Sequence, residues 1–293
     1  MWSFRRDLAR GLELGRAALR SLIFFLLLQS AVAWGEELPL WEIGVGSAGA
    51  MTPDYPGSSQ SHIKWLPFPY AVYRGEVLRS DRSGGTRARV VKTEVYEINL
   101  SGSGGLPTNS GENQARLGMS DLDWTFELGP RVLIRLNQFE SGALLKMGIA
   151  LRSAFSTDGS TTRGQGFIFE PQLQLMYPRF PFKKTSLFAN LSTAVTDQRY
   201  QSYYYEVTPE FQNSRRPAYR ADAGYFRSEL TLGTGFPIIE KSVSMALFVN
   251  YASYKGSANA DSPLMRSHDG VSYGLAFIWV LKRSEAKAHG HDI

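Results

Sequence analysis

Acidic residues gather in one segment of the sequence, where they could bind a divalent cation. Asp121 and Asp123 are two residues apart, so in an extended chain their side chains point to the same side. Glu112 lies shortly before them, and carboxylate oxygens are ligands that Ca²⁺ and Mg²⁺ prefer. Asp121 can equally accept hydrogen bonds that hold a loop together, and we favour that structural role. We therefore predict neither a metal site nor a cofactor.

Histidines and serines raise the alternative of hydrolysis or acyl transfer. His62 and His268 each have serines close in sequence, Ser58 and Ser267 among them. A catalytic serine needs a histidine within hydrogen-bond reach and an acidic group that orients the histidine. Serine is common in polar loops, so this spacing is not specific, and we predict no catalytic residue. The C-terminal segment His289–Asp292 could chelate a metal weakly, but we interpret it as part of a polar tail.

A proline-containing segment near the N-terminus has the composition of a tight turn. Two prolines fix the backbone φ angle, an aspartate can cap the turn, and a glycine can adopt a positive φ. The same segment could bind a ligand or a partner, but we favour the turn interpretation. Its residues are Pro53, Asp54, Tyr55, Pro56 and Gly57.

These candidate residues lie between segments in which apolar and polar residues alternate. In Trp124–Leu136 (WTFELGPRVLIRL) the even positions are mostly apolar, whereas the odd positions include Glu127, Arg131 and Arg135. Alternation of this kind predicts β-strands, and it recurs along the chain, for example in Leu145–Phe155. In a membrane barrel the apolar side would face lipid and the polar side would face a wet interior.

About twelve such segments follow residue 34, with ten as the alternative count. Several exceed ten residues, whereas strands of globular proteins usually have about five or six and a tilted transmembrane strand needs roughly 9–11. Long and short connections alternate, as in barrels with long extracellular loops and short periplasmic turns. We therefore predict an all-β fold, a transmembrane antiparallel β-barrel over residues 34–282. The expected strands lie near 40–50, 62–74, 76–82, 85–92, 94–104, 122–136, 141–155, 164–178, 184–196, 218–233, 242–256 and 269–282.

Two segments fit a regular barrel less well. Pro67 and Pro69 lack the N–H group that a strand donates to its neighbour, so we predict a bulge or a break near the extracellular end of that strand. The long loop 197–217 contains four tyrosines and the pair Arg215–Arg216, residue types that are favoured at interfaces. If this loop faces outward it suits adhesion, lipopolysaccharide contact or ligand gating; alternatively, part of it extends a strand hairpin.

The N-terminus predicts export. Residues 1–33 contain five arginines followed by the apolar run SLIFFLLLQSAVA, which ends in Ala31–Ala33. A basic region, a short apolar core and a small-residue cleavage site describe a secretory signal peptide. An uncleaved anchor is the alternative, although a membrane-spanning helix needs roughly 20 apolar residues. Together with the barrel, a cleaved signal predicts the outer membrane of a Gram-negative bacterium, with 283–293 as a polar periplasmic tail.

The composition excludes several other classes of protein. The 293 residues include no cysteine, which excludes a disulfide framework and a thiolate metal site. The chain has 32 basic and 27 acidic residues, and part of the basic excess belongs to the N-terminal segment. Because no basic stripe remains, we predict no nucleic-acid partner.

Several blocks of the sequence, in order and at suitable spacing, resemble one known family. They are AMTPDYPGSSQ, PFPYAVYRGEVLRSDRSG, SGSGGLPTNSGENQARLGMSDLDWTFELGP and SPLMRS. Together they resemble the MipA/OmpV family, the MltA-interacting outer-membrane proteins, over essentially the whole mature chain. The signature positions include Gly118, Met119 and Asp121, within a GMSDLD segment where the family has GMPDLD. The chain also continues past its closing strand, whereas many barrels end in an aromatic residue.

The resemblance implies a scaffold role. The family's named member is regarded as linking a lytic transglycosylase to a bifunctional murein synthase in peptidoglycan turnover, so these enzymes, with outer-membrane lipid, are the partners it implies. A narrow pore or solute-binding transport barrel is the alternative function, and a lipid-modifying enzyme is the second alternative. For a partner contact we propose a periplasmic turn whose aromatic and basic residues could otherwise anchor the barrel in lipid. These residues are Phe180, Phe182, Lys183 and Lys184.

Overall fold

The computed structural model describes residues 39–74, 78–81, 85–92, 95–182, 184–240 and 242–287. The predicted signal peptide, residues 1–33, lies outside the described residues, as do Lys183 and the last six residues of the tail. Within the described part of the chain, no helix has the length and apolar character needed to cross a membrane.

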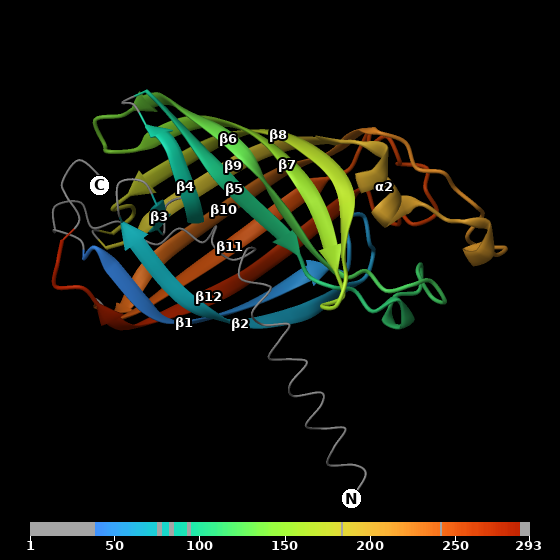
Figure 1. The fold of residues 1–293 in the computed structure, drawn as a ribbon, viewed down its shortest axis with the longest axis horizontal. Helices are drawn as coiled ribbons and strands as arrows, with labels where there is room; N and C mark the ends of the chain where they lie inside the picture. Colours follow the sequence, from blue (N-terminus) through green and yellow to red (C-terminus); the bar gives the residue numbers. More distant parts are fainter. Residues whose placement is uncertain are drawn as a thin grey trace, which may run out of the picture.

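The described strands form one closed antiparallel barrel in which sequence neighbours pair and β1 pairs with β12 (Figure 1). The prediction of an all-β barrel with about twelve strands is therefore confirmed, and most strand ends lie within three residues of the expected ones. The strands are β1 (Trp41–Pro53), β2 (Ser61–Arg74), β3 (Leu78–Asp81), β4 (Gly85–Lys92), β5 (Tyr96–Gly105), β6 (Trp124–Gln138), β7 (Leu144–Thr157), β8 (Thr162–Pro178), β9 (Ser186–Thr196), β10 (Gly224–Ile239), β11 (Val243–Ser253) and β12 (Asp269–Arg283).

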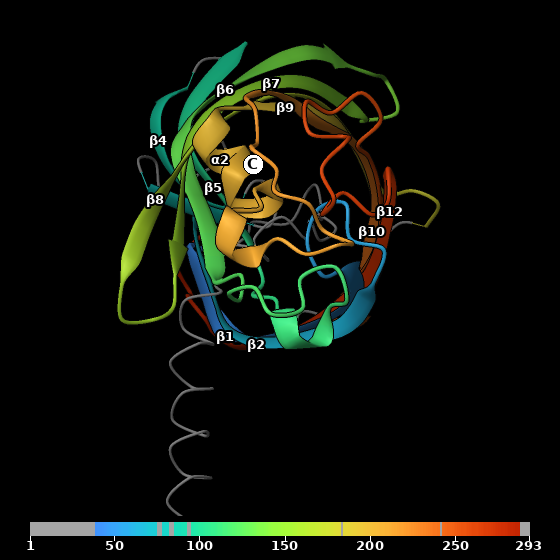
Figure 2. The same ribbon diagram turned by 90° about the vertical axis from the view of Figure 1, so that its right-hand side faces the viewer.

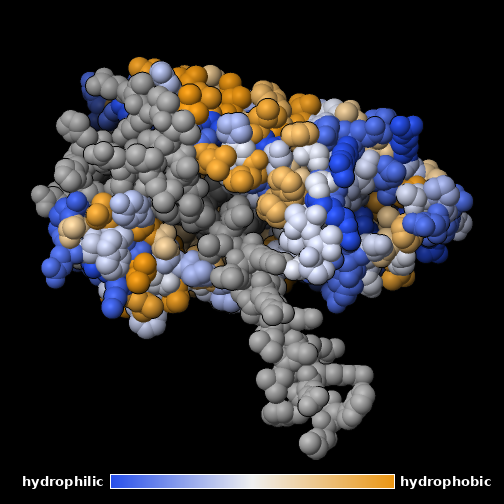
Figure 3. Space-filling view, viewed as in Figure 1, coloured by the Kyte–Doolittle hydropathy of each residue, from blue (hydrophilic) through white to orange (hydrophobic). Residues whose placement is uncertain are grey.

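Alternating side chains separate the outside of the barrel from its lumen. In β6, Glu127, Arg131 and Leu133 are buried in the lumen, whereas Leu128 is exposed on the outside. Arg135, near the end of the same strand, is exposed. Apolar residues gather over the strands in the space-filling view, and hydrophilic residues gather at the end that carries the long loops (Figure 3). A lipid-facing belt and a polar lumen follow from this period-2 pattern.

The two ends of the barrel differ in the length of their connections. Long segments follow β5, β9 and β11 at one end, which we call the loop end, and they lie across the barrel opening (Figure 2). Tight connections such as the one between β6 and β7 lie at the other end, the turn end. Just past β12, at this end, the Ser284 N–H donates to the Trp41 carbonyl oxygen (2.9 Å).

The loop after β9 contains a helix that the period-2 analysis did not predict. Helix α2 (Gln198–Tyr205) begins after Asp197, whose carboxylate accepts a hydrogen bond from the Tyr200 N–H (2.9 Å). Aspartate is a favoured N-cap because its side chain satisfies an otherwise unpaired helix N–H. The condition for a role in outside contacts, that the loop faces outward, is not met by Tyr204 and Tyr205, which are buried.

The predicted bulge or break in β2 is not seen in its pairing with β1. The register between β1 and β2 is continuous from Trp41 opposite Tyr73 to Pro53 opposite Ser61. On its other side, the described residues of β2 pair with β3 at Tyr73 and Arg74. The two prolines therefore lie within a strand whose pairing with β1 has no break.

Candidate functional site

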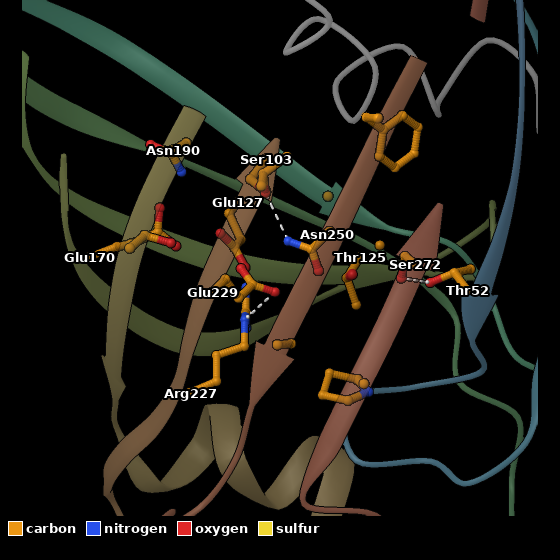
Figure 4. A pocket seen from close by; sticks show the side chains of 18 of the residues that line it. Thr52, Ser103, Thr125, Glu127, Glu170, Asn190, Arg227, Glu229, Asn250 and Ser272 are labelled. Carbon is orange, nitrogen blue, oxygen red and sulfur yellow. Dashed lines mark hydrogen bonds and ion pairs between the residues drawn. The ribbon is translucent and has the colours of Figure 1, made fainter. Parts of the chain in front are cut away.

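The lumen contains a cavity of about 390 Å³ that is lined both by strands and by the loops of the loop end. Polar side chains from β1, β6, β8, β10, β11 and β12 point into it (Figure 4). Thr52 and Ser272 share a hydrogen bond across neighbouring strands (3.0 Å), as Asn250 does with Thr231 (2.8 Å). These contacts satisfy polar groups that would be unfavourable in a dry interior.

Buried ion pairs cross one wall of the cavity. Arg152 on β7 contacts Glu127 on β6 (2.9 Å) and Glu170 on β8 (3.0 Å). The second carboxylate oxygen of Glu127 accepts a hydrogen bond from the Tyr200 hydroxyl of α2 (2.8 Å). The wall and the inserted helix are thereby joined, and breaking such a buried pair typically destabilises a protein by about 3–5 kcal/mol.

A second ion pair lies beside the first. Arg227 and Glu229, two residues apart on β10, are 2.9 Å apart. The Arg227 guanidinium also lies 4.6 Å from the centre of the Phe226 ring, a cation–π geometry. The alternation in Trp124–Leu136 predicted that Glu127 faces a polar interior, but no ion pair was predicted between Arg227 and Glu229 on β10. Their i, i+2 spacing on a strand was the available signal.

Aromatic residues form the underside of the loop cap, by which we mean the packed loops that cover the loop end. Tyr200, Tyr204 and Tyr205 surround Phe226, with ring centres 5.4–6.2 Å away. Tyr254, which follows β11, completes the cluster. Burial raises the pKa of the Tyr205 hydroxyl well above its usual value, because a phenolate would have to lose its hydration in this apolar surrounding.

The predicted turn residue Asp54 joins two segments of the loop cap. Its carboxylate contacts His62 Nδ1 (2.6 Å) and accepts a hydrogen bond from Asn113 Nδ2 (2.7 Å). Its carbonyl oxygen accepts hydrogen bonds from Thr108 and from Lys64. Asp54 thus connects the segment between β1 and β2 with the segment between β5 and β6.

The neighbouring signature residues extend these contacts. The Tyr55 hydroxyl donates to the Leu264 carbonyl oxygen (2.8 Å), and the Tyr205 hydroxyl donates to that of Pro56 (3.1 Å). Gly57 has a positive φ of 79°, and a Cβ there would lie 2.3 Å from the sulfur of Met265. The positive φ therefore favours glycine at this position, and any Cβ would also displace the Met265 side chain.

The second signature block folds against the first. Asp121 accepts a hydrogen bond from the Ser110 N–H (2.7 Å), and Arg116 donates to the carbonyl oxygens of Ser120 and Tyr204. Gly118 has a positive φ of 81°, and Met119 packs against the aromatic cluster.

Asp123 has a different neighbour, because Arg163 lies 3.6 Å from its carboxylate. Partial burial nevertheless raises the pKa of Asp123. No group of three or more potential metal ligands lies together among the described residues.

The two histidines considered for catalysis, His62 and His268, each make a structural contact within the loop cap. His62 contacts Asp54, whereas the Ser58 hydroxyl donates to the Gln60 carbonyl oxygen (2.9 Å) and accepts from Asn113. The backbone carbonyl of His268 accepts a hydrogen bond from the Tyr254 N–H (2.8 Å). These contacts hold the loop cap together.

The residues considered for a partner contact lie at the turn end, away from the loop cap. Phe180 stacks on Tyr177 with ring centres 4.7 Å apart, and 71% of Phe182 is exposed. Lys184 forms an exposed ion pair with Glu240 (2.9 Å), which follows β10. Of the four residues considered, Lys183 lies outside the described residues.

The known proteins that this chain resembles are several solved structures and one family. No curated protein matches this chain. Similar solved structures include a NanC porin (8% identity, TM-score 0.38, covering 80% of this chain and 98% of that one), a bacterial polysaccharide outer-membrane secretin (8%, 0.38, 84% and 100%) and the CymD monoaromatic hydrocarbon channel (8%, 0.35, 90% and 91%). Residues 45–281 match the family described as MltA-interacting protein MipA. The chain therefore belongs to the MipA family and is an outer-membrane β-barrel.

Proposed function

We propose that this barrel acts as an interaction protein for murein-processing enzymes and not as a general pore. The partners would be a lytic transglycosylase, as the family name indicates for MltA, and a bifunctional murein synthase. The observation that carries this proposal is helix α2, which lies in the barrel opening (Figure 2) and is joined to the wall through Tyr200, Glu127 and Arg152. A barrel whose opening is covered by an inserted helix is suited to binding at its ends.

The proposal places the protein in the outer membrane of a Gram-negative bacterium after cleavage of residues 1–33. The loop end would face outward, and the turn end, with the tail 283–293, would face the periplasm, where murein lies. Phe180 and Phe182 are then exposed to periplasmic partners. Exposed aromatic residues beside a charged pair are favourable centres of protein interfaces.

Copurification after mild crosslinking tests this proposal directly. We expect a lytic transglycosylase or a murein synthase to be enriched relative to an unrelated barrel. The double variant Phe180→Ser/Phe182→Ser should weaken binding of the purified transglycosylase by about tenfold or more, since interface aromatics often contribute 2 kcal/mol or more.

Phe139→Ser is the matched control, because Phe139 is also exposed and lies in the turn between β6 and β7 at the same end. Its binding should stay within about twofold of the unchanged protein. Equal binding by a folded double variant would contradict the proposed contact. A defect in membrane insertion without a binding defect would assign these residues to lipid anchoring.

A solute-binding or transport barrel is the second candidate function, because the lumen retains a cavity of about 390 Å³. This volume suits a small ligand. Planar-bilayer recordings separate the two candidates: discrete conductance steps favour a pore, and their absence at confirmed insertion favours the interaction protein.

A further inference from the structure

A row of neutral polar side chains, which we call the polar row, crosses the lumen wall from β8 through β12 to β1. The strand register places each member opposite the next, and the last two members share a hydrogen bond. In order, the members are Gln174, Asn190, Thr231, Asn250, Ser272 and Thr52. All of them line the lumen cavity, and Figure 4 shows Asn190, Asn250, Ser272 and Thr52 among its side chains.

The polar row has hydrogen-bonding capacity that the protein itself does not use. Four of its members satisfy one another in two hydrogen-bonded pairs. By contrast, the Oδ1 atom of Asn190 is buried and has no hydrogen-bond partner among the described residues. A buried acceptor without a partner is unfavourable. An amide of this kind in a cavity wall is suited to fixing the orientation of a bound ligand.

Apolar side chains lie beside the polar row, one step nearer the turn end. Phe188 pairs with Met176 on one side and with Gly233 on the other, and Gly233 pairs with Phe248. A Cβ at Gly233 would lie 2.2 Å from the Phe188 ring, so this glycine gives the ring room against the wall. Met176, Phe188 and Phe248 all line the cavity. The cavity therefore offers a polar edge and an apolar surface next to each other.

The charges of the cavity favour a neutral ligand. Basic and acidic side chains line it in equal number. Arg152 contacts two glutamates, and Arg227 contacts Glu229. Lys146 extends the polar row on β7, opposite Gln174, and its ammonium can donate to a neutral acceptor. A charged ligand would lose its hydration and compete with these ion pairs, whereas a neutral ligand leaves them intact.

A sugar combines the features that this cavity matches. Its hydroxyl groups donate and accept hydrogen bonds, as amide and hydroxyl side chains together do, and its ring has an apolar C–H face. We propose that the lumen binds a neutral mono- or disaccharide, with its hydroxyl edge along the polar row and its C–H face on Phe188. The cavity of about 390 Å³ has the size of a small-molecule site. This inference rests on the second candidate function, solute binding, and is independent of the partner contact at the turn end.

Saturation-transfer NMR of the full chain tests this site, with the protein held in an amphipathic polymer that carries no sugar group. Glucose and maltose are the neutral probes. Glucuronate and glucosamine are the charged comparisons, because they place a negative or a positive charge on a similar ring. We expect the tighter of the two neutral sugars to bind at least about tenfold more tightly than either charged sugar, since a buried charge would lack a partner.

Asn190→Leu removes the unused amide at nearly unchanged volume. It should weaken binding of the neutral sugar by about tenfold or more, because the sugar hydroxyl groups lose a partner inside the cavity. Asn137→Leu is the matched control, since Asn137 is exposed near the turn end and lies outside the cavity lining. This control should leave binding unchanged.

A second variant keeps the test decisive if Asn190→Leu does not fold. Asn190→Asp keeps the shape of the side chain, but an ionised carboxylate only accepts hydrogen bonds. It should weaken binding of the neutral sugar and shift the preference toward glucosamine.

Three outcomes would overturn the proposal: no binding of either neutral sugar, binding of a charged sugar that equals theirs, or unchanged binding by a folded Asn190 variant. Binding of a charged sugar alone would reject a neutral ligand and retain the solute-binding candidate. None of these outcomes bears on the partner contact at the turn end.

Discussion

The loop end and the turn end of this barrel are built by opposite means. At the loop end, residues far apart in sequence, such as Asp54, Asn113 and Tyr205, are buried and hydrogen-bonded across segments. At the turn end the connections are short, and Phe182 and Lys184 project into solvent. Long loops often carry function, but in this barrel they pack into the loop cap. The accessible side chains lie at the opposite end.

This difference has an energetic consequence. A buried polar group that loses its partner costs about 1–3 kcal/mol, whereas exposed ion pairs contribute about 0–1 kcal/mol. Substitutions at the loop end should therefore act on stability. Substitutions at the turn end should act on binding, and the following variants test this separation.

Phe226→Ala should produce the largest loss of stability. Phe226 is fully buried among three tyrosines of α2, and removing a buried phenyl ring costs about 3–5 kcal/mol. Urea unfolding of the folded barrel in detergent measures the change in the free energy of unfolding. Phe226→Leu is the conservative control and should cost about 1.5 kcal/mol or less. Similar losses for the two variants would mean that the cluster does not stabilise the loop cap.

Asn113→Ala should have the next largest effect. The Asn113 amide donates to Asp54 (2.7 Å) and to Ser58 (3.1 Å), and its removal leaves the buried carboxylate with fewer donors. We expect a loss of about 1–3 kcal/mol in the free energy of unfolding. Asn137→Ala, at an exposed position near the turn end, should change it by about 0.5 kcal/mol or less. Equal effects would remove the energetic distinction between the two ends.

Tyr55→Phe should cost about 1 kcal/mol at neutral pH, because it removes the hydrogen bond to the Leu264 carbonyl oxygen. Burial raises the pKa of Tyr55 to about 12, although the nearby Arg116 partly opposes this shift. Below pH 10 the neutral hydroxyl is present in the folded and unfolded chains. As the pH rises from about 10 to about 12, the unfolded tyrosine ionises first, so its contribution to stability is lost.

The difference between Tyr55→Phe and the unchanged protein should therefore shrink over this pH interval, because phenylalanine does not ionise. Parallel unfolding measurements at pH 8 and pH 11.5 would detect it. A constant difference would show that Tyr55 is accessible to water, against the burial seen in the loop cap.

The alternation of apolar and polar residues was enough to predict the strands and the polar lumen, because lipid and water impose opposite requirements on the two faces of each strand. It could not predict which loop residues contact one another in the loop cap. The contact between Asp54 and Asn113 joins residues 59 positions apart, and such pairing depends on how the barrel brings its loops together. The prolines of β2 were recognised as unfavourable for pairing, but only the structure shows that the register with β1 continues past both of them.

Lys184→Ala should have the smallest effect on stability. Its partner Glu240 and Lys184 itself are both largely exposed, so water already solvates the two charges well and salt screens them. The free energy of unfolding should fall by less than about 1 kcal/mol, and the loss should diminish in high salt. Glu240→Ala should give the same small change, since either substitution removes the same ion pair. A loss comparable to that of Asn113→Ala would mean that the turn end is held by its side chains as firmly as the loop end.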